Sequence, residues 1–138
     1  MDEVLLDTDI LSEILKGKDR RVVQAGDRYL AEHGRFALSA ITFYEIFRGL
    51  RAKRAVRALT NFLRLAEESD ILLISIPVLK RAADLWVHAG DGGYPRDDAD
   101  LIIAATAMET HRVLVTGNTS HFAWIPGLSL ADWRTITS

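Results

Sequence analysis

Short apolar runs alternate with helix-like stretches along this chain, and that alternation restricts the fold more than any other feature of the sequence. The runs cover residues 3–7, 35–40, 71–75 and 112–118. Apolar runs without a polar residue at every second position are typical of strands buried on both faces of a parallel sheet. Strands separated by helices form βαβ units, which place helices on both sides of the sheet. The sequence therefore predicts an α/β fold of three layers, α/β/α, around a central and mainly parallel sheet.

Apolar residues spaced three and four apart predict the helices between these strands. Glycine and proline suggest where they begin and end: Gly17 closes the first helix, Gly49 ends the third, and Pro77 suits the first turn of the fifth. The expected helices cover residues 8–17, 21–33, 41–49, 52–69, 77–88 and 99–111.

Two segments lack such spacing. Residues 89–98, which are rich in Gly, Pro and Asp, are expected to form a loop. The tail, which contains Phe122, Trp124 and Trp133, is expected to be irregular and to pack against the body of the domain.

The bulk composition excludes several classes of protein. The 138 residues are enough for one core, so residues 1–138 are expected to form a single domain. Cysteine is absent, which excludes disulfides and thiolate metal sites and favours a cytoplasmic location. The longest apolar stretches are too short to span a bilayer, and the first residues lack the pattern of a signal peptide. The net charge of −2 singles out no class of partner.

Acidic and amide side chains occur where the expected strands end. They are Asp7, Glu45, Asp98, Asp100 and Asn118. The carboxyl ends of parallel strands share one edge of the sheet, so these side chains are expected in one crevice. Unpaired like charges brought together take up protons or bind a cation, and oxygen ligands without cysteine favour Mg²⁺ or Mn²⁺. Acid clusters that hold such ions activate water for phosphoryl chemistry.

Each position also has a purely structural interpretation. Asp7 could serve only as a helix N-cap, and capping is the preferred interpretation for Thr8 and Asp9. Asp97 is expected to contribute a solvated turn and a favourable charge near a helix start. Asn118 could simply turn the chain after a strand. The combination of positions, rather than any one of them, favours a site.

Three strings of the chain resemble the PIN-domain family, and closely its VapC-type toxin branch. They are LLDTDILSE, LSAITFYEIFRGL and DADLIIAATAMETHRVLVTGNTSHFAWIPGLSLADW, and they follow the family's order through nearly the whole chain. The resemblance implies that Asp7, Glu45 and Asp100 are the catalytic, metal-binding acids. It also implies that Asn118 occupies the fourth catalytic position, where many relatives have aspartate, and that Asp98 assists in metal binding.

The resemblance implies a single PIN-like domain that acts as a Mg²⁺- or Mn²⁺-dependent endoribonuclease. Such an enzyme is the toxin of a type II toxin–antitoxin system and hydrolyses RNA phosphodiesters with an ion-activated water. The implied partners are the RNA substrate, a cognate antitoxin that occupies the acidic groove, and a second copy of the chain in a homodimer. His121 is expected to be structural, because an ion-activated water needs no imidazole base.

Basic side chains are concentrated between residues 46 and 66, where no acid occurs. This segment is expected to be a helical track for RNA phosphates, and the alternatives are a solvated helix face or a docking surface for an acidic antitoxin. Arg48 is the first candidate for binding a substrate phosphate, and Thr116 is the second. Tyr44 and Phe47 could stack on bases, although core packing explains them more simply.

Two other functions remain open. The string LLDTDIL also resembles the strand-end motif of haloacid-dehalogenase-like phosphatases, in which Asp7 would be the nucleophile and Asp9 the general acid. That interpretation gives Glu45 no role, and Leu11 stands where those phosphatases have Thr or Val. The other alternative is a non-catalytic protein. It would be either a phospho-receiver or pure metal-binding interaction module, for which the lysine expected after a late strand is missing, or a toxin-like scaffold that binds a partner but has lost activity, for which Asn118 in place of an acid is the motive.

Overall fold

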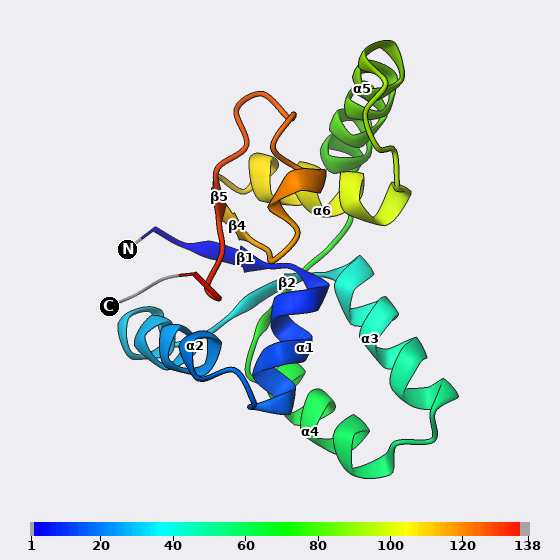
Figure 1. The fold of residues 1–138 in the computed structure, drawn as a ribbon. Coiled ribbons are helices and arrows are strands. Elements are labelled where there is room, and N and C mark those ends of the chain that lie inside the picture. Colours follow the sequence, from blue (N-terminus) through cyan, green and yellow to red (C-terminus); the bar gives the residue numbers. More distant parts are fainter. Residues whose placement is uncertain (1, 136–138) are drawn as a thin grey trace.

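The computed structural model describes residues 2–135, and each strand and helix expected from the sequence is present (Figure 1). The elements are β1 (Val4–Leu6), α1 (Thr8–Lys16), α2 (Arg20–His33), β2 (Ala37–Ser39), α3 (Ala40–Ala52), α4 (Val56–Glu67), β3 (Asp70–Leu72), α5 (Ile76–Gly92), α6 (Asp98–Glu109), β4 (Val113–Val115), the 3₁₀ turn η1 (Thr119–His121) and β5 (Leu130–Ala131). Among the described residues, no helix is both long and apolar enough to cross a membrane.

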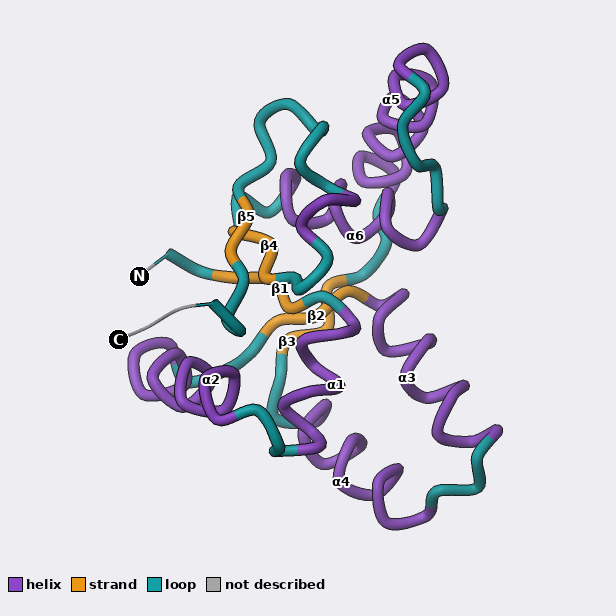
Figure 2. Tube along the Cα trace, in the orientation of Figure 1, coloured by secondary structure: helices purple, strands orange, loops and turns teal. Residues whose placement is uncertain are grey.

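The strands pair in parallel throughout, as predicted. β4 lies between β1 and β5, β2 pairs with β3, and β1 packs beside β2 in the middle of the molecule (Figure 2). The register sets Leu114 of β4 opposite Leu5 of β1 and Leu130 of β5. Because β1 and β4 run in the same direction, their carboxyl ends lie at the same edge of the sheet.

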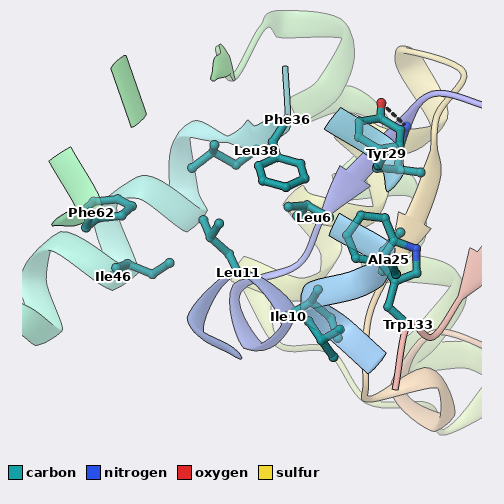
Figure 3. Close-up of a cluster of buried hydrophobic side chains, with 13 residues drawn as sticks. Leu6, Ile10, Leu11, Ala25, Tyr29, Phe36, Leu38, Ile46, Phe62 and Trp133 are labelled. Atoms are coloured by element: carbon teal, nitrogen blue, oxygen red, sulfur yellow. Dashed lines mark hydrogen bonds between the residues drawn. The ribbon is translucent and has the colours of Figure 1, made fainter. Parts of the chain in front are cut away.

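Helices cover both faces of the sheet, which gives the predicted three layers. Leu6 packs into a core formed with α1 to α4, and its neighbour Leu5 packs into a second core formed with α5 and α6. The first core contains Tyr29, whose ring stacks on Phe36 and whose hydroxyl accepts a 3.0 Å hydrogen bond from the Val4 N–H (Figure 3). Since both faces of β1 are buried, the apolar run of that strand is continuous.

The limits of α3 and α4 differ from the prediction. α3 does not end at Gly49 but continues to Ala52, and the chain then turns through residues 53–55. Arg54 makes this turn with a left-handed φ of 53°. A glycine inside a helix costs only about 1 kcal/mol, which the packing of the apolar face of α3 outweighs. The basic segment 46–66 is therefore two helices joined by a turn, not one helical track.

The expected loop and tail also contain more regular structure than predicted. α5 continues to Gly92 and ends at Gly93, whose φ of 70° closes the helix, so the loop is shorter than 89–98. In the tail, the two-residue strand β5 joins the edge of the sheet beside β4. A strand this short has no alternation by which the sequence could reveal it. The expected packing of the tail is confirmed, because Phe122 and Trp133 are buried.

Candidate functional site

Asp7 lies where β1 ends and is the N-cap of α1. Only 6% of this residue is exposed. One carboxylate oxygen accepts a 2.7 Å hydrogen bond from the Thr8 N–H, and the other accepts a 2.8 Å bond from the Thr116 hydroxyl. Burial raises the pKa of the Asp7 carboxyl to about 6, with smaller upward contributions from the charges of Asp9 and Asp100, while the two hydrogen bonds lower it.

Glu45 is half-buried on α3, one and a half turns after β2. Its Oε1 accepts a 2.9 Å hydrogen bond from the hydroxyl of Thr8, which is also 3.1 Å from the hydroxyl of buried Thr42. Thr8 therefore bonds to two of the predicted acids, to Asp7 through its backbone N–H and to Glu45 through its side chain. The sequence suggested only a capping role for Thr8, because nothing local indicates that α3 lies across from it.

Asp100 lies in the first turn of α6, which is capped by Asp97. The Asp97 carboxylate accepts a 3.0 Å bond from the Asp100 N–H, which confirms its predicted place at a helix start. Burial is the main cause that raises the pKa of Asp100, followed by the charge of Asp97, and Glu45 acts in the same direction. His121 lowers that pKa and lies 3.5 Å from the Asp100 carboxylate, a contact that the sequence did not indicate and that is compatible with the structural role expected for it.

The three acids come from separate parts of the chain and influence one another electrostatically. The charge of Asp100 raises the pKa of Asp7, and the charge of Glu45 raises the pKa of Asp100. Within residues 2–135, no three His, Cys, Asp or Glu side chains already meet in a metal-binding cluster. The donors nevertheless fit Mg²⁺ or Mn²⁺ in kind, because they are carboxylates whose mutual repulsion a hard cation would relieve.

Asp9 supports the start of α1, but not through the capping role expected for it. It does not cap α1, since Asp7 does. One of its oxygens accepts a 2.7 Å bond from the Ile10 N–H, and the other accepts a 2.9 Å bond from the N–H of Gly117, beyond the end of β4. Asp9 thus ties the start of α1 to the segment that carries Thr116 and Asn118.

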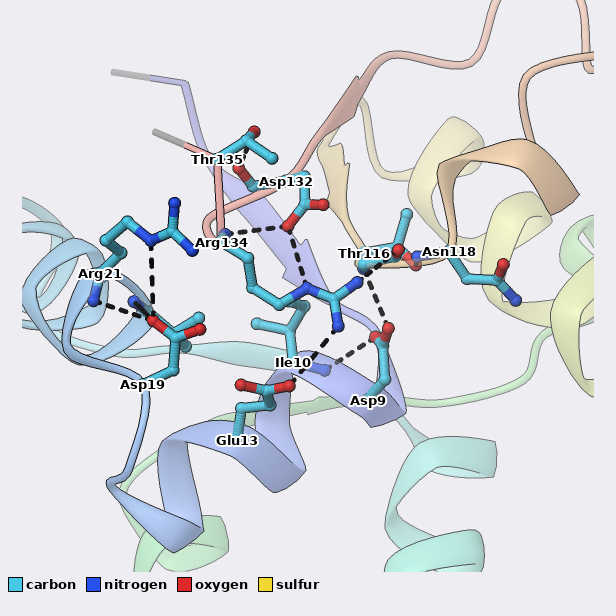
Figure 4. Close-up of polar contacts among 12 residues, drawn as sticks. Asp9, Ile10, Glu13, Asp19, Arg21, Thr116, Asn118, Asp132, Arg134 and Thr135 are labelled. Carbon is cyan, nitrogen blue, oxygen red and sulfur yellow. Dashed lines mark hydrogen bonds and ion pairs between the residues drawn. The ribbon is translucent and has the colours of Figure 1, made fainter. Parts of the chain in front are cut away.

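Thr116 and Asn118 differ sharply in exposure. Thr116 is fully buried, and its hydroxyl donates to Asp7 and accepts a 3.0 Å bond from the Asn118 N–H. Asn118 is exposed and its side chain makes no hydrogen bond within the described residues. Figure 4 shows that side chain turned away from Asp9. The backbone of Asn118 is therefore fixed, whereas its amide group faces solvent.

The remaining predicted residues lie on the surface. Asp98 is exposed in the first turn of α6. Arg48 is exposed on α3 and makes no ion pair within residues 2–135, and its guanidinium lies 4.9 Å from the centre of the Tyr44 ring. Core packing was the simpler expectation for Tyr44, but 53% of this residue is exposed. Phe47, by contrast, packs against the core and stacks on Phe43 at 5.7 Å.

A groove of about 510 Å³ runs between α1, α3 and α4 and reaches Thr8 and Glu45. Its wall is partly apolar, with Leu50 from α3, and partly basic, with Lys53 and Arg57. The sequence did not reveal this groove, because its walls come from helices whose relative placement depends on the whole fold. It brings cations of the basic segment to the same hollow as one acid of the site.

Comparisons with known proteins give a consistent result. The PIN domain family model matches residues 4–126. The chain is 31% identical to Ribonuclease VapC1 of Methanocaldococcus jannaschii, over 94% of this chain and 88% of that protein. It is 32% identical to VapC ribonuclease Y4jK of Sinorhizobium fredii, over 86% of this chain and 89% of that protein.

A solved structure described as a toxin–antitoxin complex from Klebsiella pneumoniae is similar as well. It aligns with a TM-score of 0.67 and 29% identity, over 95% of this chain and 98% of that chain. These matches confirm the resemblance that the three strings suggested and give no support to the phosphatase alternative. Because the family model spans most of its length, the chain belongs to the PIN-domain family.

Proposed function

We propose that this chain is a metal-dependent endoribonuclease, the toxin of a type II toxin–antitoxin system. The observation that carries the proposal is that Asp7, Glu45 and Asp100, from three separate parts of the chain, influence one another: the charge of Asp100 raises the pKa of Asp7, and the charge of Glu45 raises the pKa of Asp100. Support comes from the relatives, which are named as VapC ribonucleases. The reaction is the hydrolysis of an RNA phosphodiester.

In this mechanism Asp7, Glu45 and Asp100 are the residues that would hold Mg²⁺ or Mn²⁺. When bound there, such an ion would supply an activated water and neutralise negative charge on the phosphate. The chain's own contribution is to orient the acids. Thr8 orients two of them at once, through its N–H to Asp7 and its hydroxyl to Glu45, while His121 stands beside Asp100.

Two further residues act around these acids in the proposed mechanism. Asn118 would offer its exposed amide oxygen to a bound ion or its water, and Asp98 would add negative charge from the first turn of α6. Thr116, considered from the sequence for substrate binding, acts instead as a positioning residue. Its hydroxyl is buried and engaged with Asp7, so it has no free face for RNA.

Arg48 is proposed to bind a substrate phosphate. It lies one turn beyond Glu45 on α3, and its guanidinium is free of ion pairs within residues 2–135. Tyr44 lies beneath that guanidinium and is exposed, so the two side chains offer a cation and a ring to one nucleotide. The basic turn between α3 and α4 extends this positive surface.

The proposed protein partners are a cognate antitoxin and a second copy of the chain. The groove between α1, α3 and α4 suits the antitoxin, because a segment seated there would cover Glu45 while its acidic side chains meet Lys53 and Arg57. A homodimer is supported by the large apolar side chains exposed along α5 and its start, among them Leu73 and Ile76. Sedimentation of the purified chain measures its oligomeric state.

An RNA cleavage assay with metal titration tests the function. Wild-type protein is expected to cut RNA only with Mg²⁺ or Mn²⁺, and Asp7→Asn is expected to abolish cutting while the circular dichroism spectrum stays unchanged. Asp27→Asn, at an exposed position of α2, is the matched control and should cut normally. Cleavage that survives Asp7→Asn would overturn the assignment of Asp7, and no cutting by wild type at any metal concentration would favour the non-catalytic module.

A further inference from the structure

The peptide N–H and the carbonyl of Gly117 both form hydrogen bonds with charged side chains. Its N–H donates to the Asp9 carboxylate at 2.9 Å, and its carbonyl oxygen accepts a hydrogen bond from the Arg134 guanidinium (Figure 4). Gly117 lies between Thr116, which bonds to Asp7, and Asn118. Both bonds therefore act on the short segment that carries two residues of the proposed site.

Arg134 is held in place by acids from two parts of the chain. Its guanidinium lies 3.5 Å from Glu13 of α1 and 3.5 Å from Asp132. The Asp132 carboxylate also accepts a 2.9 Å bond from the Arg134 N–H. Only 33% of the Arg134 side chain is exposed. Glu13 pairs with Nη1 and Asp132 with Nε of the guanidinium. These two ion pairs orient the third nitrogen, Nη2, so that it donates to the Gly117 carbonyl.

The backbone that carries Arg134 is fixed as well. β5 pairs with β4, and the Thr116 N–H donates to the Ala131 carbonyl at 2.9 Å. Trp133 is buried against Tyr29 and Phe36 of the first core. The residue before Arg134 is thus part of the core, so this arginine belongs to a fixed part of the tail.

Gly117 leaves room for the Arg134 guanidinium because it has no side chain. A Cβ built at this position would overlap the guanidinium, and the φ of Gly117 is not in the left-handed region. A methyl group here would therefore leave the backbone conformation allowed and displace the guanidinium. Gly117 is required by the close approach of Arg134, not by an unusual turn.

We propose that Arg134 is a positioning residue of the acidic site, which it reaches from the C-terminal segment by clamping the Gly117 peptide against Asp9. The clamp fixes Thr116 and Asn118, and through Thr116 the orientation of Asp7. This proposal rests on the proposed nuclease function. Arg134 itself touches none of the acids that would hold the ion, so it acts on the rate of the chemical step through the loop.

Kinetics of Arg134→Gln and Arg134→Lys test the positioning role. Removal of a supporting interaction of this kind typically lowers activity about 10- to 100-fold. We expect Arg134→Gln to lower the kcat for RNA cleavage by about that factor with little change in KM, and Arg134→Lys to recover part of it. The matched control is Arg35→Gln, since Arg35 also pairs with an acid, Asp70, and bonds backbone carbonyls, but beside β3.

Hydrogen exchange of backbone amides, followed by NMR, tests the clamp without any activity. The amides of Gly117 and Asn118 are expected to exchange faster in Arg134→Gln than in wild type, while the amide of Leu11 in α1 is unchanged. Gly117→Ala, which expels the guanidinium but keeps Arg134, should give faster exchange at Asn118 even if Arg134→Gln folds poorly. Arg35→Gln should leave all these amides unaltered.

The outcomes separate the two proposals. Unchanged exchange at Asn118 in both clamp variants, or an unchanged kcat in folded Arg134→Gln, would overturn the positioning role. Wild-type protein that cuts no RNA would refute the proposed function, and the exchange rates would still decide whether Arg134 fixes the loop.

Discussion

Asp7 has two roles with opposite requirements for the charge of its carboxyl group. As the N-cap of α1 it stabilises the helix, and a charged oxygen serves that purpose well. As a buried group beside Asp9 and Asp100 it resists ionisation, and its pKa rises to about 6. The two hydrogen bonds that it accepts, from Thr8 and Thr116, do not offset this effect.

The raised pKa predicts how stability depends on pH when no metal is bound. Between the unfolded value of 3.8 and the folded value of about 6, the folded chain holds a proton that the unfolded chain has released. Stability from this group is therefore present below about pH 4 and is lost as the pH rises to about 6, a decrease of about 3 kcal/mol. Asp7→Asn avoids that decrease.

Melting temperatures in EDTA check this prediction. Asp7→Asn should melt above wild type at about pH 7.5 and together with it at about pH 4. Asp27→Asn should follow wild type at both values. Equal melting of Asp7→Asn and wild type at the higher pH would contradict a buried, destabilised carboxylate.

Thr8 offers a second test at the scale of one residue. Thr8→Val removes the hydroxyl that donates to Glu45 and keeps the N–H that donates to Asp7. Because supporting interactions of this kind are worth about 10- to 100-fold in activity, we expect RNA cleavage to fall by that factor. Thr8→Ser keeps a hydroxyl and should cut at nearly the wild-type rate. Normal cleavage by Thr8→Val together with a decrease in Thr8→Ser would show that packing of the methyl group, not the hydrogen bond, matters.

The sequence singled out the proposed acids but not the side chains that contact them. Asp7 and Asp100 were singled out because they stand where regular elements begin or end, and such positions share one edge of a parallel sheet. The roles of Thr8 and Asp9 could not be identified, since their partners are more than thirty residues away in the chain. Arg134 gave no signal at all, because its target is a backbone carbonyl, which every residue has.

Among the elements, α6 begins with three acids within four residues, and each has a different role. Asp97 caps the helix, Asp98 is exposed, and Asp100 belongs to the proposed site. A negative charge at a helix start is favourable, but the charge of Asp97 also raises the pKa of Asp100. Helix capping and the ionisation of Asp100 thus depend on the same side chain.

Substitutions of Asp97 separate these effects. Asp97→Ala removes the bond to the Asp100 N–H and should destabilise the protein by about 1 kcal/mol, whereas Asp97→Asn keeps a capping oxygen and should cost much less. Both remove the charge that raises the pKa of Asp100, so both should shift the acid limb of the pH–activity profile to lower pH. Urea unfolding and activity as a function of pH measure the two results.

Element types were easier to predict than element ends. Core side chains repeat along whole helices, so all six helices were predicted. The predicted end of α3 at Gly49 was wrong, because packing of the apolar face of α3 outweighs the free-energy cost of a glycine inside the helix. The strand β5 was not predicted, because two residues are too few to show the alternation of side chains that is typical of a strand. Ends and short strands depend on contacts with the rest of the fold, which a local pattern does not contain.

At the scale of the whole molecule, the charges are separated although their sum is small. Asp7 follows the carboxyl end of β1, and Glu45 and Asp100 lie near the starts of α3 and α6. The cations gather where α3 turns into α4, and Lys53 and Arg57 line the groove that also reaches Glu45. This arrangement attracts a polyanion to one part of the surface and brings its phosphates toward the acids. The net charge of −2 therefore does not argue against RNA.

Salt dependence tests that separation. Removing one cation that neutralises a phosphate should reduce the slope of log affinity against log salt by about 0.7 for a single strand. The combined variant Lys53→Ala, Arg54→Ala, Arg57→Ala should thus bind RNA more weakly and with a smaller slope than wild type. Arg28→Ala, on the exposed side of α2, is the control. Equal slopes for all three proteins would exclude the basic turn from RNA binding.

The place of β5 has a consequence for the order in which the site becomes complete. The strand that fixes the Thr116 N–H, and the arginine whose guanidinium bonds to Gly117, both follow β4 in the chain. A partly folded chain in which β1 to β4 have paired contains Asp7, Glu45 and Asp100, but it lacks the clamp on the loop beside them until β5 docks against β4. Under the proposed role of Arg134, docking of β5 is therefore the step that brings RNA cleavage to its full rate.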